Sequence, residues 1–163
     1  MEINKETAKE LIQNYFGSEL IENLSEINDG FAKRTYRFDF KKQFFLLQIW
    51  DEPNHKLTRN KLNLTDDIYR QSIENLFHAK NILDSLSIRT PGIIHRDTSK
   101  RLVPYDFAIL EFIAGGNLFE NPSKFNNDRF ISELGEMFGR INSIQRSYPG
   151  HIAGNGKSYN LIP

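Results

Sequence analysis

The fold of this chain is decided by residues 26–50, EINDGFAKRTYRFDFKKQFFLLQIW. Two segments within this stretch, residues 36–40 and 44–49, have the aromatic and aliphatic composition of β-strands. The polar pair Lys41 and Lys42 stands between them and suits a tight reversal of the chain. The stretch therefore predicts an antiparallel hairpin.

The first segment has an alternating pattern, in which Tyr36, Phe38 and Phe40 are separated by Arg37 and Asp39. Successive side chains of a strand point to opposite faces of the sheet. We therefore expect this strand to have one apolar face and one face in contact with water.

The second segment, residues 44–49, is apolar except for Gln48, which predicts a strand covered on both faces. Ahead of the hairpin, Asn28-Asp29-Gly30 predicts a turn, because glycine lets the backbone bend tightly and come close to another group. At this point an ordinary hairpin without a binding role remains the alternative.

Composition limits the classes of protein that the chain can belong to. Its 163 residues are 39% hydrophobic and 12% aromatic, with thirteen Phe, which indicates one folded domain or one large lobe. The 21 basic and 21 acidic residues balance, so charge gives no reason to expect a nucleic acid or an anionic membrane as partner. The absence of cysteine excludes disulfides, thiolate metal sites and a cysteine nucleophile.

The N-terminus is polar and shows no signal-peptide pattern. No apolar run reaches the roughly 20 residues that a membrane-spanning helix needs. We therefore expect a soluble, cytoplasmic protein.

The remaining elements follow from apolar periodicity and from glycine and proline breaks. We predict helices over residues 5–16, 66–86 and 127–144, strands over 21–27, 93–94 and 105–113, and mostly irregular structure over 147–163. Ile113-Ala114-Gly115-Gly116 predicts a hinge between the last strand and the last helix. This order predicts an α+β lobe with a five-stranded antiparallel sheet and a helix packed on one face. It matches the upper, N-terminal lobe of a kinase-like fold.

Four segments resemble motifs of the aminoglycoside phosphotransferase and choline kinase-like family. They are the glycine turn Gly30–Tyr36, the strand Phe45–Ile49, the hinge run Ile109–Gly115 and the helix end Phe138–Asn142. The order and spacing are those of the N-terminal part of that family, and the resemblance extends from the first helix to about Ile144. It implies a nucleotide-binding N-lobe over residues 1–113, with a hinge and the start of a truncated C-lobe over 114–163.

The resemblance also implies a site for ATP. The turn Gly30 to Thr35, with Phe31, Lys33 and Arg34, would cover the phosphates, and Gln48 would face them from the neighbouring strand. The hinge backbone at Glu111, Phe112 and Ile113 would bind the adenine edge. The implied function is that of the nucleotide-binding lobe of an ATP-dependent small-molecule phosphotransferase.

Departures from the family pattern bear on this function. Gln48 stands where kinases place a phosphate-binding lysine, and Ala79 stands near the position of its glutamate partner, with Glu74 more than a turn earlier. Lys33 replaces the asparagine of the turn and could restore a positive charge, and Asn142 replaces a histidine.

The family's catalytic loop and later metal-binding aspartate correspond to positions beyond residue 163. We therefore expect Mg²⁺ only in a complete protein, and we expect this chain alone to be inactive. The rival hypothesis is a non-catalytic kinase-like binding or scaffold module. The missing C-lobe or a second copy of the chain is expected to cover the helix at 127–144.

Three motifs imitate catalytic ones. His95-Arg96-Asp97 and Asp106-Phe107-Ala108 spell or nearly spell kinase triplets, but they lie before the hinge and too close together, so we interpret them as strand and turn. Residues 154–158, GNGKS, resemble the end of a P-loop, but the first glycine is out of register and no helix can follow. The four histidines show no metal-ligand spacing.

Overall fold

The computed structural model describes residues 3–17, 21–27, 33–51, 73–115 and 127–144, and the backbone of residues 151–152 and 158–159. The predicted turn at 28–30, the predicted loop after Asp51 and the first part of the predicted helix at 66–86 fall on residues outside these ranges.

Three helices and seven strands are present in the described ranges. The helices are α1 (Lys5–Phe16), α3 (Ile73–Ser85) and α5 (Asp128–Asn142). The strands are β1 (Glu22–Ile27), β2 (Arg34–Phe40), β3 (Gln43–Trp50), β4 (Ile93–Asp97), β5 (Asp106–Glu111), β6 (His151–Ile152) and β7 (Ser158–Tyr159).

Helix α1 begins and ends at residues that suit its termini. The Asn4 side chain accepts a hydrogen bond of 2.9 Å from the backbone N–H of Thr7, which caps the first turn. Gly17 follows the helix with a φ of 85°, a conformation that glycine adopts without strain. The buried side chains of α1 are Ala8, Leu11 and Ile12. The periodicity of the sequence predicted this helix and its bounds.

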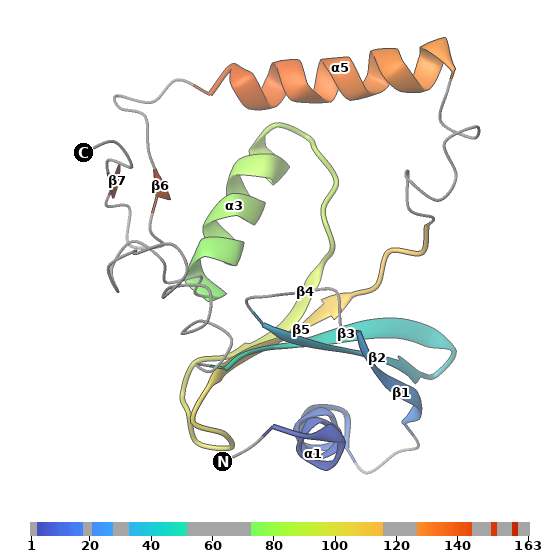
Figure 1. Ribbon diagram of the computed structural model, residues 1–163, viewed down its shortest axis with the longest axis vertical. Coiled ribbons are helices and arrows are strands. Elements are labelled where there is room, and N and C mark those ends of the chain that lie inside the picture. Colours follow the sequence, from blue (N-terminus) through green and yellow to red (C-terminus); the bar gives the residue numbers. More distant parts are fainter. Residues whose placement is uncertain are drawn as a thin grey trace.

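The first five strands form one antiparallel sheet in the order β1-β2-β3-β5-β4 (Figure 1). Strand β3 is therefore central, and it carries Gln48 opposite Thr35 of β2 and Ala108 of β5. This confirms the predicted α+β class, the five-stranded antiparallel sheet and the central position of Gln48.

The predicted hairpin joins β2 and β3. Phe40 pairs with Gln43, so the reversal consists of Lys41 and Lys42 alone. Their φ angles are 50° and 63°, and two-residue hairpin turns of type I′ require positive φ at both positions. The chain thus uses two lysines where asparagine and glycine are the commonest choice.

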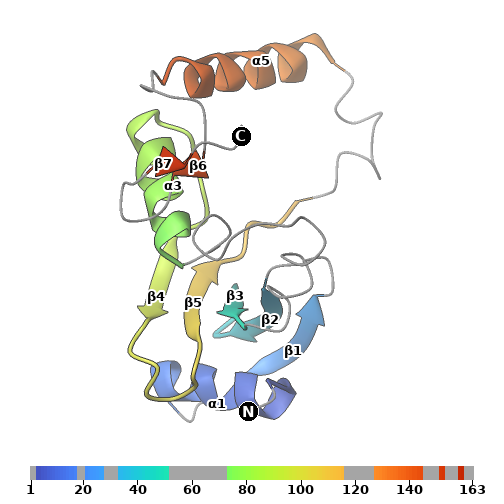
Figure 2. The same ribbon diagram turned by 60° about the vertical axis from the view of Figure 1, so that its left-hand side comes forward.

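Helices cover both faces of the sheet, and Figures 1 and 2 agree on their placement. Helix α1 packs under one face, where it contributes to the larger core cluster with Tyr36, Phe38 and Leu47. Helix α3 packs on the opposite face, where Ile73 joins a second cluster with Trp50. The predicted packing of the second helix against the sheet is confirmed for its described part, and the sheet is the middle of three layers.

Strand β3 is covered unevenly, which corrects one expectation. On the α1 face, Phe45, Leu47 and Ile49 are all buried. On the other face, Trp50 is 8% exposed and Leu46 packs against the second cluster, but Phe44 is 42% exposed. The strand is therefore not covered on both faces at Phe44.

The last described segments are α5 and a short ladder. The Asn127 side chain caps α5 by accepting a hydrogen bond of 2.8 Å from Phe130 N–H. Strands β6 and β7 pair as a two-stranded antiparallel sheet within a tail that was predicted to be mostly irregular. Strand β7 begins at Ser158, so the helix that a P-loop requires after its lysine is not formed there.

Candidate functional site

The α3 face of the sheet holds two of the residues that sequence reasoning assigned to phosphate. Thr35 pairs directly with Gln48 across β2 and β3, so both side chains belong to this face. Lys33 lies two residues before Thr35 and therefore continues the same face, beside the end of β3 that carries Trp50.

The Lys33 side chain turns inward over this face. Its Nζ atom donates a hydrogen bond of 2.7 Å to Oε1 of Gln48, and it lies 5.4 Å from the centre of the Trp50 ring. Burial lowers the pKa of Lys33 below its ordinary value, because desolvation disfavours the charged form. Among the described residues, no carboxylate pairs with this ammonium group. The site is thus a partly buried cation that a neutral amide and an aromatic ring hold in place.

This geometry places a charge beside Gln48, at the position where kinases carry a phosphate-binding lysine. Lys33 comes from the neighbouring chain segment and places its ammonium within hydrogen-bond distance of the Gln48 amide. A positive charge therefore lies next to residue 48, although residue 48 itself is neutral.

Glu74, in the first turn of α3, contacts a residue of β4. Glu74 Oε1 lies 3.5 Å from Arg96 of β4, and the Arg96 guanidinium lies 4.2 Å from the centre of the Phe77 ring. Glu74 is therefore directed toward β4, and its contact is with Arg96 rather than with Gln48.

Arg34 lies on the opposite face of the sheet from Lys33. Its Nε atom lies 2.8 Å from a carboxylate oxygen of the buried Asp51, and its Nη1 atom donates to the backbone oxygen of Ile3 at 2.8 Å. The Asp51 side chain raises the pKa of Arg34 through this hydrogen bond. The structure thus does not bring Arg34 together with Lys33 and Gln48.

A second cation on the α3 face escaped the sequence reasoning. The Arg37 guanidinium lies 4.7 Å from the centre of the Phe44 ring and 4.8 Å from that of Phe112. Both distances suit cation–π contacts. Alternation along β2 already placed Arg37 on the same face as Thr35, but its two aromatic partners come from β3 and from the hinge.

Two N–H groups of the hinge backbone already form hydrogen bonds within the sheet. Glu111 N–H donates to Gly92 at 2.8 Å, and Phe112 N–H donates to Phe44 at 3.2 Å. Within the described ranges, Ile113 N–H makes no hydrogen bond, and the Ile113 side chain is 45% exposed. An adenine at the hinge, which stays a prediction, would have the hinge carbonyls and the N–H of Ile113 available for hydrogen bonds.

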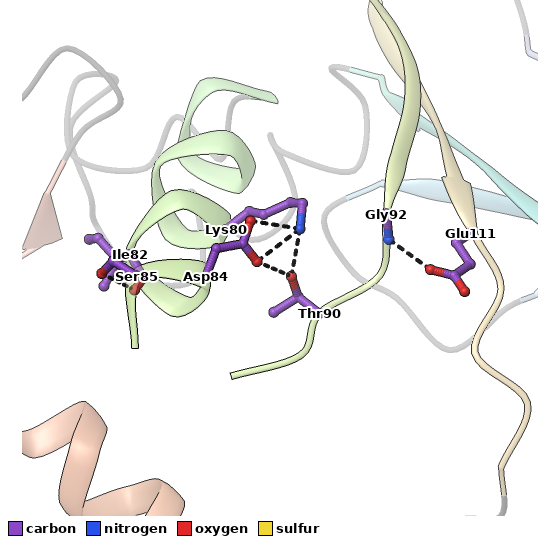
Figure 3. Close-up of polar contacts among 7 residues, drawn as sticks. All are labelled: Lys80, Ile82, Asp84, Ser85, Thr90, Gly92 and Glu111. Atoms are coloured by element: carbon purple, nitrogen blue, oxygen red, sulfur yellow. Dashed lines mark hydrogen bonds and ion pairs between the residues drawn. The ribbon is translucent and has the colours of Figure 1, made fainter. Parts of the chain in front are cut away.

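Separate polar contacts lie along the connection from α3 to β5, as Figure 3 shows. Glu111 Oε2 accepts a hydrogen bond of 3.1 Å from Gly92 N–H. Lys80 Nζ lies 3.0 Å from Asp84 and 3.0 Å from the Thr90 hydroxyl. The first contact joins the end of β5 to the residue before β4, and the others join α3 to the segment that leads into β4.

Two predicted phosphate residues, Gly30 and Phe31, lie outside the described part of the chain. Their roles, and those of all the residues assigned to ATP, stay predictions.

The kinase-like triplets are strand and turn, as interpreted. His95 stacks on Tyr15 of α1 with ring centres 4.4 Å apart, and Asp97 accepts a hydrogen bond of 2.6 Å from Ser99 N–H. A side-chain hydrogen bond from Ser99, assisted by this backbone bond, lowers the pKa of Asp97. Phe107 and Ala108 are buried in β5.

The described ranges offer neither a metal site nor a membrane-spanning helix. They contain no cluster of three or more histidine, cysteine, aspartate or glutamate side chains able to hold a metal ion. None of their helices is long and apolar enough to cross a membrane.

Comparisons with known proteins give a likeness at the level of structure only. No protein-family model matches the sequence, and no curated protein matches it. The structure is similar to a crystal structure from Ralstonia eutropha JMP134, provisionally described as an aminoglycoside phosphotransferase, with a TM-score of 0.43 and 12% sequence identity. The similarity covers 71% of this chain and 29% of that chain, so this chain spans less than one third of that protein's length.

Proposed function

We propose that this chain is the nucleotide-binding lobe of an ATP-dependent small-molecule phosphotransferase, in which Lys33 contacts the phosphates. The motif resemblance, the sheet order and the hinge support this function. The observation that carries it is the 2.7 Å contact between Lys33 Nζ and Gln48 Oε1, which holds a partly buried cation without a carboxylate among the described residues.

An anion would relieve the electrostatic cost of this arrangement. Two unit charges about 4 Å apart attract by roughly 4 kcal/mol at an effective dielectric of about 20, before desolvation is subtracted. An ammonium group that is already desolvated loses less hydration when a phosphate arrives. Lys33 is therefore better prepared to bind phosphate than a lysine on a fully exposed loop.

The Gln48 amide adds to this preference for anions. An ammonium group can only donate hydrogen bonds, so its partner must be the amide oxygen of Gln48. The NH₂ group of Gln48 is then left to donate to a ligand. Lys33 and Gln48 would thus offer donors, and no acceptor, to a phosphate oxygen.

The remaining ligand contacts follow the hinge. The adenine edge would use the N–H of Ile113 and neighbouring carbonyls, since the N–H groups of Glu111 and Phe112 already bond within the sheet. Phosphoryl transfer also requires a base and Mg²⁺ ligands. We assign neither role to a residue of this chain, and the proposed role is nucleotide binding.

A non-catalytic binding or scaffold module is the second candidate. The same Lys33–Gln48 hydrogen bond favours it, because it gives the Lys33 ammonium group and the Gln48 amide oxygen a partner without a ligand. At the hinge end of the same face, Phe44 and Phe112 likewise give the Arg37 guanidinium partners without a ligand.

Titration calorimetry with ATP separates the two candidates. The chain would be compared with Lys33→Met, Gln48→Lys and, as a control, Lys9→Met on the exposed side of α1. We expect Lys33→Met to weaken binding about tenfold, which corresponds to about 1.4 kcal/mol. Gln48→Lys should bind more tightly, Lys9→Met should match the parent chain, and the differences should shrink as salt rises. If none of the four chains binds ATP, the scaffold module is favoured. If all four bind ATP equally, Lys33 and Gln48 do not contact the phosphates.

A further inference from the structure

The Lys33 amino group lies in surroundings that suit a nitrogen nucleophile. Its Nζ atom donates a hydrogen bond of 2.7 Å to Gln48 Oε1, and it lies 5.4 Å from the centre of the buried Trp50 ring. The Lys33 side chain is half-buried, and no carboxylate among the described residues pairs with it. Within the described ranges, no negative charge therefore favours the ammonium form over the free amine.

Burial shifts this balance toward the free amine. Desolvation penalises the charged form and lowers the pKa of Lys33 below the ordinary value of 10.5. At a given pH, a larger fraction of Lys33 is therefore uncharged than of a lysine in water. Only the uncharged amine has the lone pair that attacks an electrophilic carbon, which is why desolvation activates lysine nucleophiles in enzymes.

Gln48 provides a ligand-binding group beside this amine. Its amide oxygen accepts the hydrogen bond from Lys33, so the NH₂ group of the same planar amide remains able to donate to a ligand oxygen. Because the NH₂ group and the amide oxygen share one carbon atom, a ligand oxygen bound there lies close to Lys33 Nζ. A phosphate group held by Gln48 would thus bring the group attached to it next to the amine.

We propose that Lys33 is a site of acylation by acyl phosphates. The Nζ lone pair attacks the carbonyl carbon of the acyl phosphate, so that a nitrogen–carbon bond forms and the carbon–oxygen bond to phosphate breaks. Phosphate leaves with the bonding electron pair, and the proton lost from nitrogen passes to water. The product is an uncharged amide at Lys33, and no group is oxidised or reduced.

Acylation would also regulate the nucleotide site, and this consequence rests on the proposed function. An acylated Lys33 keeps one N–H group for Gln48 Oε1 but carries no positive charge. ATP phosphates would then lose the cation that we assign to them, so acylation should weaken ATP binding, and bound ATP should protect Lys33. The acylation step itself requires no nucleotide.

Exposure to solvent alone predicts a different order of reactivity among the lysines. Lys9 is exposed on α1, whereas Lys33 is half-buried. Lys80 is a matched comparison, because its side chain is only 23% exposed but its Nζ atom pairs with Asp84 at 3.0 Å. If access governed acylation, Lys9 would react fastest. If the uncharged amine and the Gln48 donor govern it, Lys33 reacts faster than both.

Incubation of the full chain with acetyl phosphate, followed by mass spectrometry of its peptides, measures the acetylation rate at each lysine without nucleotide. At neutral pH we expect Lys33 to react about threefold faster than Lys9, and Lys80 to react most slowly. The rate at Lys33 should rise with pH and level off below the ordinary lysine pKa of 10.5. A Lys33 rate equal to or below that of Lys9 would overturn the proposal.

Gln48→Glu tests the role of the neighbouring amide. The variant keeps an acceptor for Nζ but adds a negative charge, which favours the ammonium form of Lys33 and repels the phosphate of the reagent. Acetylation of Lys33 should therefore fall about tenfold, a change of about 1.4 kcal/mol in the barrier. The rate at Lys9 in the same variant is the internal control, and circular dichroism checks the fold. An unchanged rate at Lys33 would exclude Gln48 from the reaction.

Titration calorimetry of ATP against the acetylated chain separates this inference from the proposed function. Weaker ATP binding after acetylation would support both. If Lys33 is acetylated but ATP binding is unchanged, the acylation site stands and the phosphate contact of Lys33 is wrong. If ATP binds but Lys33 reacts no faster than Lys9, the proposed function stands and the acylation site is wrong.

Discussion

The Arg34 guanidinium lies 2.8 Å from the Asp51 carboxylate, and only 2% of the Asp51 side chain is exposed. The same guanidinium reaches the backbone oxygen of Ile3. The pair therefore connects the segment before α1 to the end of the central strand.

Removing Arg34 should destabilise the fold. Arg34→Met leaves a buried carboxylate without its charged partner, and breaking a buried pair in this way costs about 3 kcal/mol. Part of the Arg34 side chain is exposed and Asp51 has further contacts, so we expect about 2 kcal/mol. Urea unfolding would measure the loss.

A double-mutant cycle with Asp51→Leu separates the pair from its surroundings. We expect a coupling energy of about 1–2 kcal/mol between Arg34 and Asp51. Additive effects of Arg34→Met and Asp51→Leu would show that the contact does not contribute to stability.

Lys33→Met should change how stability depends on pH. Burial lowers the folded-state pKa of Lys33, whereas the unfolded chain keeps the ordinary value near 10.5. The folded state therefore carries an electrostatic penalty that is fully present below the folded pKa and disappears as pH rises toward 10.5. The variant lacks this penalty, so its stability relative to the parent should be greatest at neutral pH and should fall as pH rises.

Thermal unfolding at a series of pH values from neutral to alkaline would measure this difference. Lys9→Met removes an exposed lysine and should show no comparable trend. A constant difference between Lys33→Met and the parent chain at every pH would contradict the lowered pKa.

The hairpin turn offers a stabilising substitution. Lys42 has a φ of 63°, which costs a residue with a side chain roughly 1 kcal/mol. Lys42→Gly removes that strain but adds about 0.5 kcal/mol of unfolded-state entropy, so the expected net gain is about 0.5 kcal/mol. Lys9→Gly, within α1, should instead cost about 1 kcal/mol. If the two substitutions were equally destabilising in urea unfolding, the turn would not be of this type.

Helix α1 should be an integral part of the fold rather than an appendage. Ile12 is completely buried against the sheet, so Ile12→Ala should cost about 3 kcal/mol through lost contacts and a residual cavity. Lys9→Ala on the exposed side should change stability by less than about 0.5 kcal/mol. A small effect of Ile12→Ala on the urea midpoint would mean that α1 is dispensable.

Local patterns were sufficient to predict most of the fold. Alternation from Tyr36 to Phe40 set the buried face of β2, and two polar residues between apolar segments set the hairpin register. The exposure of Phe44 could not be predicted from the pattern of its own strand. It depends on which side chains from other segments pack over that end of β3.

The candidate site was predictable only in part. The sequence indicated that Lys33 could replace a missing charge, but its contact with Gln48 requires the register between two strands and an inward rotamer. Arg34 was assigned to the same site because it is adjacent to Lys33 in sequence. Side chains alternate between the two faces along a strand, so the Arg34 side chain lies on the opposite face of the sheet. The partners of Arg37 come from distant segments, which no local pattern connects.

Strand β3 is paired on both edges, by β2 and β5, and its two faces belong to different core clusters. Opening its amides to solvent therefore requires separation of neighbouring strands and disruption of both clusters at once. Hydrogen–deuterium exchange should report the global free energy of unfolding at the amide of Leu47. The amides of α5, which has no buried residue, should instead exchange through local fraying. The chain would then contain a slowly and a rapidly exchanging set of amides. Only the exchange rates of the slow set would depend strongly on denaturant concentration.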